Sequence, residues 1–116
     1  MTIAKAIIAN LPENFNWQSI YMENFIKALV YLYQKNNYPT DIPPTIAIYP
    51  GNHHCIELYD GSALAFFTDK DLDISDCKVF WIKAFESYTD AKNYIAPLAG
   101  ASHNDSVREF YTQTRH

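Results

Sequence analysis

Glycine is scarce in this chain, which has only Gly51, Gly61 and Gly100 among its 116 residues. Turns or a helix end account for all three, so none remains to build a loop that cradles a phosphate group. The pattern Gly-x-Ser-x-Gly of a nucleophile elbow does not occur either. The sequence therefore excludes the phosphate-binding loops of nucleotide-binding proteins and the catalytic elbow of the α/β-hydrolases.

Disulfide frameworks and membrane spans are equally unsupported by the sequence. Cys55 and Cys77 are too few for the framework of a small secreted domain, and we expect reduced thiols packed as small apolar groups. No stretch approaches the roughly 20 apolar residues that span a bilayer. The N-terminal segment is interrupted by Lys5 and lacks a convincing cleavage site. We therefore expect a cytoplasmic protein that does not associate with membranes.

Positive charge is scarce in the middle of the chain. The net charge is −4, and residues 57–90 hold eight acids against three lysines, a local net charge of −5. Protein contacts to nucleic-acid phosphates come mainly from lysine and arginine. A nucleic-acid partner is therefore not expected, whereas a protein partner with a basic surface is.

Apolar residues, by contrast, are plentiful. A hydrophobic content of 48% with 16% aromatic residues excludes disorder, and the length fits one domain. The obvious joint is a proline-rich segment that blocks helix and holds the chain extended. We expect a single α+β domain, 1–116, with a helical region over residues 1–38, the joint 39–44, an antiparallel meander 45–85 and C-terminal helices 87–115.

Before the joint, the apolar pattern predicts a long helix over 17–36. Apolar side chains recur there at three- and four-residue steps and make one broad stripe: Met22, Phe25, Ile26, Leu29, Leu32 and Tyr33. Asn16 is suited to cap the start of this helix, and Asn36 with the asparagine after it is suited to end it. Residues 2–10 fit a helix or a strand, and we favour a short helix ended by Pro12.

After the joint, the apolar period changes to two. It predicts four strands, Thr45–Tyr49, His54–Tyr59, Ser62–Thr68 and Lys78–Phe85. Ser87 is then expected to cap a short helix that runs to about Ala96. A last helix is expected to start within 102–105, with Val107, Phe110 and Tyr111 on one face. The predicted fold is a long N-terminal helix packed on a meander of about four strands, followed by C-terminal helices.

The dipeptide Asp60-Gly61 predicts a two-residue hairpin turn, which sets the register of the two strands that it joins. The turn pairs Tyr59 with Ser62, Glu57 with Leu64, Cys55 with Phe66 and His53 with Thr68. One face of the hairpin is almost wholly apolar and is expected under the long helix: His54, Ile56, Leu58, Ala63, Ala65 and Phe67. The side chains of His53, Cys55 and Glu57 are expected on the other face, toward solvent or a partner.

His53, Cys55 and Glu57 also define an alternative, a small metal- or thiol-dependent enzyme. Zinc sites show closely spaced ligand pairs, which this chain lacks. Neither cysteine directly precedes a predicted helix N-terminus that would lower its pKa. The acidic segment 69–76 does not form a calcium loop, because the position that requires glycine holds Ile74. We expect no metal and no cofactor.

The acidic segment and the aromatic residues instead favour partner binding. Both faces of the strand 78–85 are apolar, which suits a central strand, but an open face would make Trp81 an interface anchor. The residues expected to contact a partner are Tyr59, Asp69, Asp71, Asp73, Asp76 and Trp81. The predicted function is a small protein-binding module that occludes a basic site on a macromolecule. Immunity proteins, antitoxins and phage-encoded inhibitors share this profile. The sequence leaves the oligomeric state open, a homodimer included.

Overall fold

A computed structural model describes residues 1–11, 20–73, 76–102 and 104–108. The elements are α1 (Ile3–Ala9), β1 (Ile20–Tyr21), α2 (Met22–Lys35), β2 (Thr45–Tyr49), β3 (His53–Glu57), β4 (Ala63–Thr68), β5 (Lys78–Phe85), α3 (Tyr88–Ile95) and a 3₁₀ turn (Ala96–Leu98). Residues 104–108 are helical as well. The five strands form one antiparallel sheet in the order β1-β5-β4-β3-β2.

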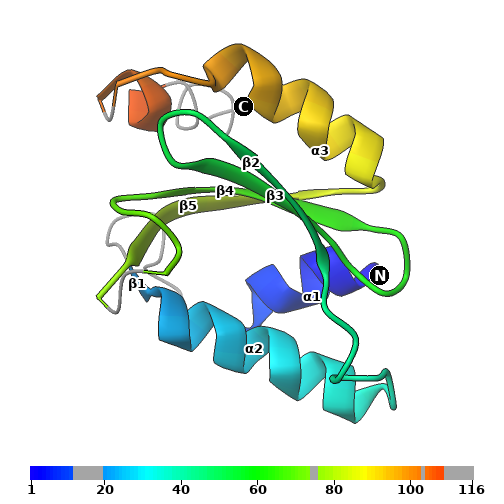
Figure 1. Cartoon of the computed structure of the whole chain (residues 1–116). Coiled ribbons are helices and arrows are strands. Elements are labelled where there is room, and N and C mark those ends of the chain that lie inside the picture. The colour runs from blue at the N-terminus through cyan, green and yellow to red at the C-terminus, as the bar shows by residue number, and fades with distance from the viewer. Residues whose placement is uncertain (12–19, 74–75, 103, 109–116) are drawn as a thin grey trace.

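The sheet lies between two layers of helix (Figure 1). Helices α1 and α2 cover one face, and α3 with the chain that follows it covers the other. The α+β class is confirmed, and β2 to β5 form the predicted meander in chain order. A buried cluster fills the space on each side of the sheet, so β3 to β5 are apolar on both faces.

The prediction of one long N-terminal helix is wrong. The structure shows a helix of 7 residues, α1, and a helix of 14 residues, α2. Ile20 and Tyr21 are not helical but form β1, which pairs with β5, and the Met22 N–H donates to the carbonyl of Cys77 at 2.9 Å. Burial of Ile20 against the sheet outweighs continuation of the helical pattern. Residues 17–19 and the expected cap Asn16 lie outside the described residues.

The start of α1 and the end of α2 follow from local chemistry. The Thr2 side chain caps α1 by accepting from the Lys5 N–H at 3.2 Å, which settles the ambiguity of residues 2–10 in favour of a helix. The two asparagines end α2 as predicted. Asn37 takes a φ of 59°, and the Tyr38 N–H reaches back to the carbonyl of Tyr33 at 2.8 Å. This is a Schellman motif, and it turns the chain back toward the sheet.

The predicted register of the β3–β4 hairpin is wrong by one residue. Cys55 pairs with Ala65, not with Phe66. The Leu58 N–H donates to the Ser62 carbonyl at 2.8 Å, so the loop has three residues and not two. Gly61 ends this loop with a φ of 88°.

The shift exchanges the two faces of β4. Leu64 and Phe66 join the cluster under α1 and α2, together with Ile56. Ala63, Ala65 and Phe67, which were expected under the long helix, belong to the cluster under α3. His54 lies on the α2 side as predicted, because the assignment of β3 faces did not depend on the loop length.

The C-terminal region follows the prediction where it is described. The Ser87 hydroxyl accepts from the Asp90 N–H at 3.1 Å and caps α3, which ends at Ile95. The Ser102 hydroxyl accepts from the Asp105 N–H at 3.2 Å at the start of the last helical turn. The predicted apolar positions 110 and 111 lie outside the described residues.

Candidate partner-binding surface

An apolar groove of about 580 Å³ opens between α2 and the edge strand β2. Its floor is the buried cluster under α2, including Phe25, Ile56 and Phe66. Residues of α2 form one wall, and the segment 39–46 forms the other. The volume lies in the range of small-molecule and peptide sites, and the lining is predominantly apolar.

The groove exists because the proline-rich joint stands away from α2. The Schellman turn at Asn37 ends α2, and the prolines that follow hold the chain extended on its way back to β2 (Figure 1). The start of this segment, beside α2, is fixed by contacts among tyrosines. The Tyr59 N–H donates to the Tyr33 hydroxyl at 2.8 Å, and the rings of Tyr38 and Tyr59 lie 4.6 Å apart between centroids. The tip of the β3–β4 hairpin is thereby tied to the C-terminal end of α2.

Four isoleucines beside the groove are exposed to an unusual degree. Their exposed fractions are 50% for Ile26, 61% for Ile42, 41% for Ile46 and 69% for Ile48. Register places Ile46 and Ile48 on the α2 side of the sheet, opposite Ile56 and His54. No described helix covers this side of β2. Clustered exposed apolar side chains of this kind mark interaction surfaces more often than scattered single ones do.

The carboxylates of the acidic loop between β4 and β5 fall into two groups: those that bond within the loop and those that a partner can reach. Asp69 accepts from the Lys78 N–H at 2.7 Å and closes the loop. Asp76 pairs with Lys70 at 2.7 Å, and this hydrogen bond lowers the pKa of Asp76 below its ordinary value. Asp71 and Asp73 are exposed, and neither forms an ion pair with any described residue.

Asp71 and Asp73 therefore carry the charge that a partner can reach. Together with Ile48 and His54 they line a cavity of about 220 Å³ at the end of β2. Leu72, between the two acids, lines both this cavity and the large groove, so the acidic loop borders the groove.

The two predicted aromatic anchors lie in different environments. Tyr59 is 56% exposed at the hairpin tip and remains accessible. Trp81 is 1% exposed under α3, and its indole N–H donates to the Ser106 hydroxyl at 3.2 Å. Trp81 therefore does not reach the surface, because the C-terminal segment covers the face of β5 on which it lies. Its role as an anchor is not supported.

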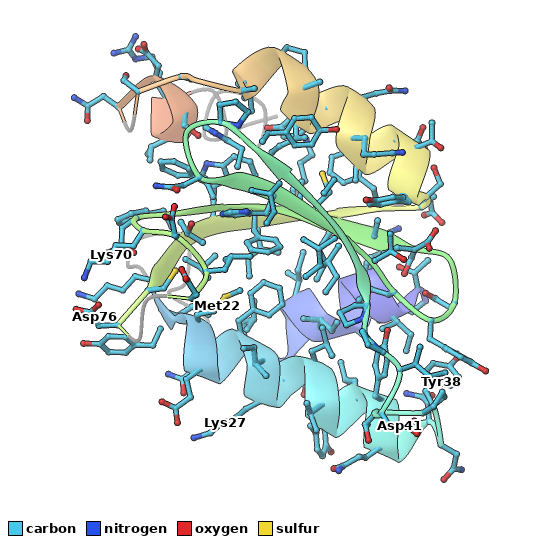
Figure 2. The ribbon with its side chains drawn as sticks, in the orientation of Figure 1. Met22, Lys27, Tyr38, Asp41, Lys70 and Asp76 are labelled. Carbon is cyan, nitrogen blue, oxygen red and sulfur yellow. The ribbon has the colours of Figure 1, made fainter. Side chains whose placement is uncertain are left out.

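Tyr59 and the acidic loop also lie at opposite ends of the molecule. Figure 2 shows Lys70 and Asp76 side by side at one end, with Tyr38, the ring neighbour of Tyr59, at the other. The predicted site residues do not converge on one point. What joins them is the groove along β2, which sequence analysis missed. Its signal was the run from Pro43 to Ile56, which has no formal charge although it contains surface isoleucines.

His53 belongs to a buried hydrogen-bond chain under α3. Its Nδ1 lies 3.4 Å from the Pro50 carbonyl, which only accepts, so Nδ1 carries the proton and Nε2 is the acceptor. The Ser106 hydroxyl lies 2.8 Å from Nε2 and donates to it, while the same oxygen accepts from Trp81. A serine that donates to histidine is also the geometry of an activated nucleophile. Here both side chains are 0% exposed, so the pair joins the C-terminal segment to the sheet.

His54 is buried on the opposite face as a neutral ring. The Thr68 hydroxyl donates its only proton to the Lys70 carbonyl at 2.8 Å, so His54 Nε2, at 2.9 Å, must donate to Thr68. Its Nδ1 is then an acceptor, and no described donor lies within hydrogen-bond distance of it. Burial lowers the pKa of His54 to about 4, the charge of His53 adds to this effect, and Asp71 opposes it.

Two residues of the alternative enzyme, His53 and Cys55, lie in the core and not at the surface. The side chain of Cys55 is fully buried under α3, and burial raises its pKa to about 12, so the thiol is protonated and shielded. Cys77 is also buried, with its pKa raised by burial. Within the described ranges, no group of three or more histidine, cysteine or acidic side chains is arranged to hold a metal ion.

Comparison with known proteins gives no relative from which a role could be transferred: no family model, no curated protein and no solved structure matches the chain significantly. Among the residues that the structure describes, no helix has both the length and the apolar character needed to cross a bilayer.

Proposed function

We propose that this protein is a binding module that captures a protein partner along the groove beside β2. The observation that carries the proposal is the continuity of an open apolar groove with the exposed carboxylates of Asp71 and Asp73, which form no ion pair with any described residue. Apolar surface supplies affinity, and charge at its border supplies steering and selectivity. Tyr59 lines the other end of the groove, half exposed, and is suited to anchor the partner there.

The partner is a protein with basic residues at its contact surface. Attraction between the acidic loop and such a surface accelerates association without contributing much to the stability of the fold. When the partner's apolar surface fills the groove, its basic residues meet the acidic border and lose contact with solvent, which is how an inhibitor or neutraliser acts. We therefore place the protein among small inhibitors of the immunity, antitoxin or phage-inhibitor type.

The test begins with capture of partners from the native host on the immobilised protein, followed by association kinetics with each captured partner. The double variant Asp71→Asn/Asp73→Asn should associate more slowly, and association of the wild type should slow as salt rises, because salt screens steering. The matched control is Glu23→Gln/Glu86→Gln. It also removes two negative charges, but from side chains that line neither cavity. The control should associate as the wild type does.

Neutralisation is measured on the captured partner itself. Addition of the wild-type protein should abolish the partner's own activity in proportion to the complex formed. Partners that bind equally to the wild type and to the Asp71→Asn/Asp73→Asn variant, at rates independent of salt, would refute the proposed surface. A partner that stays fully active in the complex would refute inhibition while leaving binding in place.

A further inference from the structure

Strand β2 presents an open edge to solvent. It ends the strand order, and no described residue pairs with its outer side. Alternate backbone N–H and C=O groups of an edge strand point outward and can pair with another chain. Proteins usually block such edges with a lysine, a proline or a bulge. The segment Thr45–Tyr49 contains none of these, and its pairing with β3 is regular throughout.

One face of this edge is also open and apolar. Ile46 and Ile48 lie on the side of the groove, and α2 does not reach over them. A strand added beside β2 would place every second side chain next to these isoleucines, at the mouth of the groove. An added strand therefore satisfies two features at once, the unpaired backbone and the uncovered apolar face. A small apolar ligand in the groove would satisfy only the second.

The acidic residues near the two ends of β2 indicate which residues the added strand should carry. The edge has no formal charge between Pro43 and Ile56, but acids stand at both of its ends. Asp71 and Asp73 lie beside Ile48, and Asp41 lies at the other end, near Tyr38 (Figure 2). The complement to this arrangement is an apolar strand with basic residues at its two ends.

We propose that β2 accepts, as an additional strand of the sheet, an extended segment of a partner protein whose apolar face is flanked by lysine or arginine. Main-chain hydrogen bonds to the β2 edge hold the segment, and apolar side chains enter the groove between β2 and α2. The proposal rests on the proposed function, because it specifies how the partner of that same surface is bound.

A second copy of this chain is a poorer occupant of the edge. Antiparallel self-pairing about Ala47 would set Ile46 opposite the second copy's Ile48, which is favourable. It would also bring the Asp71 end of each copy beside the Asp41 end of the other, so that like charges meet at both ends. The same acids that attract a basic segment oppose a dimer through this edge.

The test uses synthetic peptides of alternating valine and threonine, flanked by lysines in one and by glutamates in the other. Fluorescently labelled peptides are titrated with the full-length protein, and binding is followed by anisotropy. The lysine-flanked peptide should bind saturably, and the glutamate-flanked peptide should bind about tenfold more weakly or not at all. Equal binding of the two, or no saturable binding of the lysine-flanked peptide, would overturn the proposal.

Backbone methylation separates strand addition from simple burial in the groove. Methylating alternate amides blocks one edge of a strand and leaves the other edge free. Of the two complementary methylation patterns, one should abolish binding and the other should preserve it. Amide NMR should then show protection and shift changes at residues 45–49. Equal tolerance of both patterns, or changes confined to the β1 side of the sheet, would refute strand addition.

Two variants locate the contact and separate the two proposals. Ile48→Lys places a like charge in the path of the basic segment and should weaken peptide binding about tenfold. Tyr31→Lys, at another exposed position, on α2, that lines neither cavity, should bind as the wild type does. A partner that binds Ile48→Lys normally but Asp71→Asn/Asp73→Asn slowly would overturn strand addition and leave the proposed function standing. If the free protein is a dimer and Ile48→Lys dissociates it, strand addition by a partner is refuted, and a second copy occupies the β2 edge instead.

Discussion

The buried, neutral His54 makes the stability of the protein depend on pH in a defined window. Its pKa is about 4 in the folded protein, below the ordinary value of 6.5, because burial disfavours the charged ring. Between these two pH values the unfolded chain binds a proton that the folded protein does not. The contribution of His54 to stability is therefore complete above about pH 6.5 and is lost as pH falls toward about pH 4.

The magnitude follows from the size of the shift. A difference of about 2.5 pKa units corresponds to about 3 kcal/mol once both states are protonated, at 1.36 kcal/mol per unit. At about pH 4.5 most of this, about 2.5 kcal/mol, is already lost. Burial also lowers the pKa of His53, which adds a loss of the same sign. Asp71 opposes the shift of His54 and limits its size.

Urea unfolding at about pH 7 and about pH 4.5, on the wild type and on His54→Gln, isolates this contribution from that of the carboxylates. The glutamine amide retains a donor for Thr68 but does not titrate. The wild type should lose about 2.5 kcal/mol more than the variant over this interval. Equal losses, or an NMR titration of the His54 ring near its ordinary pKa, would refute the burial argument.

Three further predictions concern packing, backbone and thiol chemistry. Phe25→Ala should cost about 3–5 kcal/mol in urea unfolding, and Leu29→Ala less, because Phe25 is 2% exposed whereas Leu29 is only partly buried; equal costs would contradict this placement of the core. Gly51→Ala should lower the melting temperature of the protein more than Gly100→Ala does, although both glycines have positive φ. The reason is that only the Cβ added at residue 51 meets backbone atoms, at 3.2 Å. Cys55 should resist iodoacetamide in the folded protein and react once urea unfolds it, and rapid alkylation without urea would contradict its burial.

The sequence by itself determined most elements whose signals are local. Helix caps at Ser87 and Ser102 depend on a hydroxyl and an N–H three residues later, and the turn at Asn37 depends on the tolerance of asparagine for positive φ. The meander strands were predicted from an apolar period of two and from runs of β-branched and aromatic residues. Such signals act within a few residues, so the sequence displays them directly.

The tip of the β3–β4 hairpin also makes a contact that no local pattern contains. The Asp60 carboxylate accepts from the Ile3 N–H at 2.9 Å, 57 residues away, and also from the Ser62 N–H and hydroxyl. These bonds belong to the hairpin tip whose loop has one residue more than Asp60-Gly61 predicts. One extra residue is enough to exchange the two faces of β4, because side chains alternate with a period of two.

The candidate site was likewise decided by tertiary structure. The sequence shows that Tyr59 is aromatic and that Asp71 is acidic. It does not show that Tyr59 lines the groove while Asp71 lines the smaller cavity beside it. It shows that Trp81 is a potential anchor, but only the position of the C-terminal segment over β5 buries it. Exposure depends on which element packs over a residue, and that depends on the arrangement of the whole chain. The sequence determined the chemistry of each side chain, and the fold determined which of them a partner can reach.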